Sequence, residues 1–164
     1  MFFTTACSSS KNDVSLDESS TTSNMEQDYS TQSEESTNTD KVNEENEMKI
    51  NIIVQNQTFV ATLANNKTAN AFVEMLPMTI DMEDVNGNEK YYKLSETIRQ
   101  ESAENPGTIQ IGDIKCYGDA GIVLFYDTFP TSYSYVSIGH IEDTDGLVDV
   151  LGEGSVEVTF TRAD

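Results

Sequence analysis

A sharp break in composition near residue 48 limits where this chain can fold. Between Lys11 and Glu47 the sequence consists mostly of Ser, Thr, Asn, Glu and Asp, and the few larger apolar residues are isolated: Val14, Leu16, Met25, Tyr29 and Val42. Such a segment cannot bury enough apolar surface to offset the conformational entropy lost on ordering. We therefore predict a disordered acidic linker up to residue 47 and one folded domain over residues 48–164.

The charge of the chain argues against several classes of partner. Its 29 acidic residues against 9 basic ones give a formal net charge of -20 at pH 7. A protein this acidic repels phosphate backbones and anionic lipid headgroups, so we expect no nucleic-acid partner and no direct adsorption to membranes. The sequence also has no apolar run near the roughly 18 residues that a membrane-spanning helix needs.

The first ten residues carry a second informative feature. Ala6 places a small residue before the single cysteine Cys7, and the Ser-rich acidic linker follows at once. This arrangement resembles the cleavage box and tether of bacterial lipoproteins, although only residues 1–3 stand where a signal peptide has a basic region and roughly 7–15 apolar residues. The resemblance implies lipidation of Cys7 and an extracytoplasmic protein of a bacterium, anchored to the membrane through that lipid alone. The alternative is an unmodified cysteine in a disordered tail.

From residue 48 onward the pattern is that of a β protein. Short runs rich in β-branched and aromatic residues alternate with turn signals. We predict strands over residues 49–55, 58–63, 78–82, 90–94, 108–111, 114–117, 122–126, 133–138 and 155–161, and helices over 67–75 and 144–151. Asn65 or Asn66 is expected to cap the first helix, which Pro77 ends, and Thr144 to cap the second. About eight short strands with two short helices indicate a mainly β fold, a closed or nearly closed antiparallel barrel.

A set of short motifs runs through the domain in a fixed order. Its members are residues 71–72, 75–80, 82–84, 89–90, 112–114 with Tyr117, 124–127 and 138–141. Together they span roughly residues 48–160, and their order resembles the bacterial cyclophilin-like domain family. The resemblance implies a closed eight-stranded barrel with two short capping helices, the architecture of the peptidyl-prolyl isomerases.

The resemblance to true cyclophilins does not extend to their catalytic residues. Phe125 stands where the isomerases have the phenylalanine of the proline pocket, but Val123 replaces the active-site glutamine and Tyr135 replaces the pocket histidine. The catalytic arginine has at best Lys93 as a stand-in, and a lysine cannot supply the planar guanidinium fork. We therefore expect a non-catalytic ligand- or peptide-binding module displayed on a bacterial cell surface. The alternatives are a weak peptidyl-prolyl isomerase and an accessory subunit of another surface protein.

Aromatic residues gather in the second half of the domain. We expect some of them to fill the core and the others to line a shallow groove for a small molecule or a peptide. Because the net charge disfavours anions, a neutral or cationic ligand with an apolar body is expected. Phe125 and Tyr135 are expected to face the same concavity. The candidate groove residues are Tyr92, Tyr117, Phe125, Phe129, Tyr133 and Tyr135.

Other chemistry finds little support in the sequence. His140 is the only histidine, and metal sites and acid–base pairs need converging partners, so we interpret it as a hydrogen-bonded residue at a strand end. Cys116 lies between Asp113 and Asp119, whose negative charge raises the pKa of a thiol, so we expect no reactive nucleophile. We predict a monomer with no metal, no cofactor and no catalytic residue.

Overall fold

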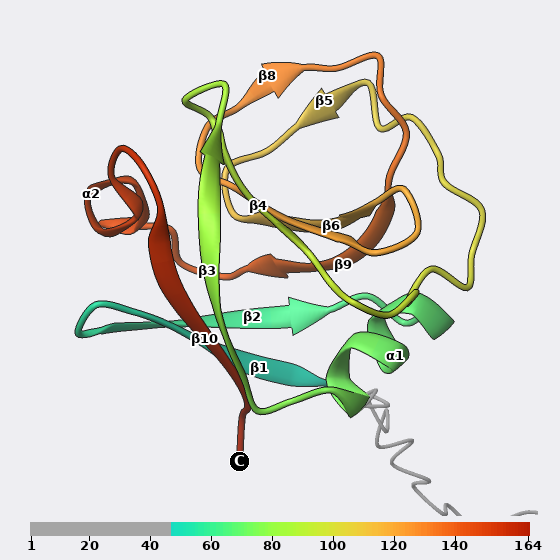
Figure 1. Cartoon of the computed structure of the whole chain (residues 1–164), viewed down its shortest axis with the longest axis horizontal. Coiled ribbons are helices and arrows are strands. Elements are labelled where there is room, and N and C mark those ends of the chain that lie inside the picture. The colour runs from blue at the N-terminus through green and yellow to red at the C-terminus, as the bar shows by residue number, and fades with distance from the viewer. Residues whose placement is uncertain (1–46) are drawn as a thin grey trace, which may run out of the picture. The chain divides into compact units, whose positions relative to one another are not determined.

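A computed structural model describes residues 47–164, and Figure 1 shows their arrangement. Cys7 and nearly all of the predicted linker lie outside the described residues, so lipidation and linker disorder stay predictions. The elements are β1 (Lys49–Val54), β2 (Gln57–Leu63), α1 (Lys67–Glu74), β3 (Met78–Val85), β4 (Glu89–Lys93), β5 (Thr108–Ile109), β6 (Asp113–Tyr117), β7 (Gly121–Phe125), β8 (Phe129–Pro130), β9 (Val136–Ile141), α2 (Leu147–Leu151) and β10 (Val156–Arg162).

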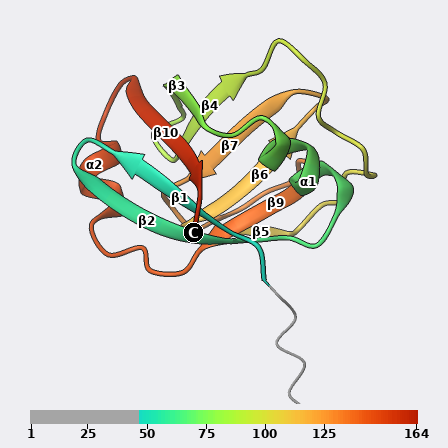
Figure 2. The same ribbon diagram turned by 90° about the horizontal axis from the view of Figure 1, so that it is seen from below.

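Eight of these strands close into an antiparallel barrel, as predicted. Their order is β1-β10-β3-β4-β7-β6-β9-β2, and β2 pairs with β1 to complete the ring. The helices α1 and α2 lie on opposite sides of the barrel (Figures 1 and 2). The two remaining short strands, β5 and β8, pair with each other outside the barrel.

The interior of the barrel follows from alternation along the strands. On β1, Ile50, Ile52 and Val54 point inward and are completely buried, while the residues between them are partly exposed. Burying one such side chain contributes about 1.5–3 kcal/mol. Phe72 of α1 meets Phe160 of β10 edge to face, with ring centroids 5.4 Å apart. This contact attaches the helix to the barrel core.

The two helices begin in different ways. Asn66 caps α1 as predicted, because its side chain accepts a hydrogen bond of 2.8 Å from the backbone N–H of Ala69. The prediction that Thr144 caps α2 is wrong. That helix starts after Gly146, which adopts a left-handed φ of 78° and makes no capping bond through a side chain. Thr144 contributes its backbone carbonyl instead, which accepts from the N–H of Leu147 at 3.0 Å.

Residues 133–135 do not belong to the barrel strand that the sequence predicts there. The strand β9 begins only at Val136, and residues 129–135 pair instead with residues 104–109. Glu104 and Tyr135 exchange two backbone hydrogen bonds of 2.9 Å, and Ile109 pairs with Phe129. We call these two segments, 104–109 and 129–135, the outer layer.

The composition of β7 explains why an outer layer is needed. All five residues of this strand are buried, although alternate side chains of a strand point to opposite faces. Ile122 and Leu124 belong to the barrel core, so Val123 and Phe125 point away from it. Ile109 and Phe129 of the outer layer pack against this second pair. In Figure 1, β5 and β8 run side by side above the sheet.

The strand β4 carries a completely buried charged group, Lys90. Its ammonium lies 2.6 Å from Asp84 Oδ2, 2.8 Å from the carbonyl of Gly152 and 2.6 Å from that of Gly154. The hydroxyl of Tyr126 donates to the same Asp84 oxygen at 2.7 Å. The hydrogen bonds from Lys90 and Tyr126 hold the pKa of Asp84 below its ordinary value. The cluster joins the β3–β4 hairpin to the loop between α2 and β10.

Candidate functional site

Five of the six candidate groove residues form a continuous series of ring contacts outside the barrel. Phe129 lies 5.9 Å from Phe125, and Phe125 lies 5.6 Å from Tyr135 with the ring planes at 88°. Tyr135 lies 5.5 Å from Tyr117, which in turn meets Tyr133 at 6.0 Å and 87°. Edge-to-face pairs at these distances are a favourable aromatic geometry. We call this series the aromatic ridge.

Exposure divides the ridge into a base and a free end. Phe125 is 0% exposed and Tyr135 is 8% exposed, so both are packing residues. Tyr117 and Tyr133 are 43% and 61% exposed, although each keeps an aromatic ring as a neighbour. Two tyrosines on a buried aromatic base therefore present their rings to solvent.

The sixth candidate, Tyr92, does not join the ridge. It packs against the barrel core, and its neighbour Tyr91 packs against the Val123–Phe125 side instead. The register explains the difference, because Tyr91 pairs with Val123 and Tyr92 pairs with Ile122. The sequence could not distinguish two adjacent tyrosines, since only the pairing with β7 determines which one faces outward.

A hollow of about 400 Å³ lies beside the free end of the ridge, with Tyr91 and Tyr117 in its wall and residues 93–97 and 118–121 around them. Gly121 makes room for Tyr91: a Cβ there would lie only 2.7 Å from Cε2 of that ring. We call the hollow beside Tyr91 and Tyr117 the first hollow.

A smaller hollow, of about 160 Å³, adjoins the base of the ridge and is called here the second hollow. Its lining residues are Glu104, Asn105, Pro106, Lys115, Tyr135 and Ser137. Lys115 is only 8% exposed and lies on β6 two residues before Tyr117, so alternation places both on the outward face. This lysine is not among the residues that the sequence suggested for the site. The alternation along β6, which places Lys115 on the same face as Tyr117, could have indicated it.

Asp113 organises the charges next to the second hollow. Its Oδ2 lies 3.2 Å from the Lys115 ammonium and accepts from the backbone N–H of Gln110 at 3.1 Å. Its Oδ1 lies 3.1 Å from Nδ1 of His140. The lone histidine thus has a carboxylate partner. Within residues 47–164 no group of three or more His, Cys, Asp or Glu side chains is arranged to hold a metal ion.

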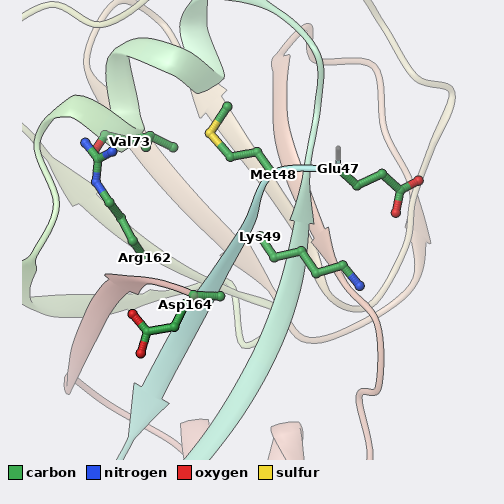
Figure 3. A pocket seen from close by; sticks show the side chains of 7 residues that line it. Glu47, Met48, Lys49, Val73, Arg162 and Asp164 are labelled. Carbon is green, nitrogen blue, oxygen red and sulfur yellow. The ribbon is translucent and has the colours of Figure 1, made fainter. Parts of the chain in front are cut away.

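A third hollow, of about 410 Å³, lies where β1 begins and β10 ends. Figure 3 shows Arg162 turned toward Val73 and the Lys49 side chain extending elsewhere. Both cations have partners: Arg162 donates to the carbonyl of Val73 at 2.9 Å, and Lys49 pairs with Glu142 at 2.6 Å. The lining contains no aromatic residue. We therefore place the candidate site at the ridge.

Two further residues singled out from the sequence have simple environments. Cys116 is completely buried, and burial raises the pKa of its thiol to about 11, so little thiolate forms near neutral pH. Lys93 is exposed and lines the first hollow. Among the described residues no helix is both long and apolar enough to cross a membrane.

Comparisons with known proteins agree with this architecture. The family model described as the cyclophilin-like family matches residues 52–161. The solution structure of a hypothetical protein from Archaeoglobus fulgidus is similar, with a TM-score of 0.52 and 20% sequence identity over 71% of this chain and 95% of that chain. At this identity the similarity shows the fold alone. No curated protein matches the sequence.

Proposed function

Because the chain belongs to the cyclophilin-like family, we propose that its barrel is a non-catalytic binding module whose ligand lies along the aromatic ridge. The supporting observation is the pair Tyr117 and Tyr133, which are 43% and 61% exposed and touch edge to face at 6.0 Å. Tyrosine rings held by a rigid base offer a large apolar contact area at low entropic cost. The first hollow extends this surface along Tyr91.

The positions of the arginines support binding without catalysis. The chain has only two, Arg99 and Arg162. Arg99 pairs with Asp119 at 2.7 Å, and Arg162 binds the carbonyl of Val73, so neither guanidinium belongs to the ridge. Phe125, which stands where the isomerases have the phenylalanine of their proline pocket, is completely buried under the outer layer. A buried ring offers no surface to a proline.

The binding function can be tested by titrating the full chain with a panel of end-blocked tetrapeptides that carry apolar or aromatic central residues. Chemical-shift changes should appear at the ridge tyrosines. Tyr133→Ala should weaken the best peptide about tenfold, which is a typical cost for one anchor residue. Val148→Ala removes another exposed apolar side chain, on α2, and should leave affinity unchanged. Equal affinity in the Tyr133 variant and the wild type would contradict the assignment.

A coupled proline-isomerisation assay tests the alternative. We expect no turnover above the uncatalysed rate. Turnover by the wild-type chain above that rate would establish the weak isomerase instead.

Surface display through Cys7 forms the second half of the proposal. It is supported by the lipoprotein-like motif Ala6-Cys7-Ser8 and the acidic linker behind it. Expressed behind a lipoprotein signal peptide, the chain should partition into bacterial membranes, and Cys7→Ser should release it, because the lipid is the only expected anchor. Membrane retention of the Cys7→Ser variant would refute the lipid anchor while leaving the ridge assignment intact.

A further inference from the structure

Two buried lysines in this domain differ in how well their ammonium groups are satisfied. Lys90 is surrounded by three acceptors at 2.6–2.8 Å. Lys115 is almost as buried, yet within the described residues its ammonium makes one ion pair, with Asp113 at 3.2 Å, and no further hydrogen bond. An ammonium carries three N–H donors. Within residues 47–164 the only buried side-chain nitrogen or oxygen without a partner is Asn88 Oδ1, so the Lys115 donors that Asp113 does not use are open to solvent. Lys115 thus has donor capacity left for another group.

The second hollow is the space next to Lys115 in which a ligand group can accept such a hydrogen bond. Lys115 lines this space of about 160 Å³ together with Tyr135 and Pro106. Tyr135 is also the centre of the ridge, in contact with both Phe125 and Tyr117. Tyr135 therefore belongs both to the ridge and to the wall of the hollow that Lys115 lines.

The charges around Lys115 favour a neutral group over an anion as the acceptor of its hydrogen bond. Asp113 lies beside Lys115, and Glu104 lines the same hollow. Two carboxylates against one ammonium leave no net attraction for a free carboxylate or another anion. A neutral carbonyl oxygen can still accept a charge-assisted hydrogen bond from the lysine.

We propose that Lys115 donates a hydrogen bond to a backbone carbonyl of the ligand, so that the ridge binds a peptide through its interior rather than through a free C-terminus. This inference rests on the proposed binding function of the ridge. It adds a specificity determinant that favours ligands with a carbonyl at this position over ligands that end in a carboxylate there or that have no carbonyl.

Two matched probes separate the carbonyl from the aromatic ring. N-acetyl-tyrosinamide offers both, whereas 4-ethylphenol offers the same ring without a carbonyl. In NMR titrations of the full chain, Lys115→Met should weaken the amide about tenfold and change the phenol less than twofold. Lys67→Met, which removes an exposed lysine on α1, should change neither. N-acetyl-tyrosine, with its free carboxylate, should bind the wild type more weakly than the amide does.

The outcomes distinguish this inference from the function on which it rests. Equal weakening of both probes by Lys115→Met would mean that the lysine only holds the ridge together, and tighter binding of the carboxylate than of the amide would mean that the site selects anions. Either result overturns the inference and leaves the ridge as a binding surface. If the wild type binds none of the three probes, both the inference and the proposed function fail.

Should the Lys115→Met variant not fold, the wild type supplies the test. The side-chain Cε–H signal of Lys115 must then shift with the amide and stay fixed with the phenol.

Discussion

The two faces of strand β7 show how one sequence run serves two environments. Its inward residues Ile122 and Leu124 belong to the apolar core of the barrel, which consists of buried side chains with a few partly buried ones packed against them. Its outward residues Val123 and Phe125 lie under an incomplete cover, which ends in two exposed tyrosines. The inward residues are enclosed by the core, whereas the outer face combines a buried aromatic base with exposed apolar surface. The first face contributes to stability, and the second carries the binding surface that we propose.

The largest expected loss of stability comes from a substitution in the barrel interior. Phe160→Ala removes a completely buried ring that contacts Phe72 at 5.4 Å, and it should lower the free energy of unfolding by about 3–5 kcal/mol. Urea denaturation of the full chain measures this change. A loss below about 1 kcal/mol would mean that the barrel interior is not the stability centre that we describe.

The next largest loss of stability is expected at Lys90, and it can be compared with the loss at the second buried lysine, Lys115. Lys90→Met removes the cation that pairs with Asp84 and the donor to two backbone carbonyls, and it should cost about 3 kcal/mol. Lys115→Met removes one partner at 3.2 Å and should cost about 1 kcal/mol or less. Urea denaturation of both variants gives the comparison. Equal costs would show that Lys115 is as fully satisfied as Lys90 and would weaken the case for its role in ligand binding.

A smaller effect should appear in the pH dependence of stability. The pKa of Asp84 is lowered by its hydrogen bonds from Lys90 and Tyr126, so the ionised carboxylate stabilises the fold above its ordinary value of 3.8, and this contribution is lost as the pH falls below it. Asp84→Asn should therefore reduce the loss of stability between pH 7 and pH 3. This difference is measured by urea denaturation at the two values.

Glu89 is the matched control for this titration, because its shift has the opposite sign. Burial raises the pKa of Glu89, so its ionisation costs stability as the pH rises. Glu89→Gln should make the difference in stability between pH 7 and pH 3 larger. If the two variants shift that difference in the same direction, our assignment of these two carboxyl environments is incorrect.

The smallest effect on stability is expected at the free end of the ridge. Tyr133 is 61% exposed, so Tyr133→Ala should change the free energy of unfolding by less than about 0.5 kcal/mol. Tyr135→Ala removes an 8% exposed ring that touches two other aromatic residues and should cost several times more. Thermal unfolding of the two variants separates them. Similar losses would mean that Tyr133 belongs to the packed base.

Much of the fold could be predicted because its signals are local. The β-branched runs around Ile50 and Val158 alternate with the period of a half-buried strand, and Asn66 followed by Lys67 marks a helix start. The candidate site was predicted less completely. Five of the six named aromatic residues meet, but Tyr92 belongs to the core and Lys115 was not among the candidates.

The sequence by itself determined where α1 and most of the barrel strands lie and that β7 is apolar along its whole length, because these properties depend on neighbours a few residues away. Only the tertiary structure decided which of Tyr91 and Tyr92 faces outward, that residues 129–135 leave the barrel to cover Phe125, and that Lys115 is buried beside a hollow. The physical reason is the two-residue period of a strand. A change of one residue in register exchanges its two faces, and register is established only when distant strands pair.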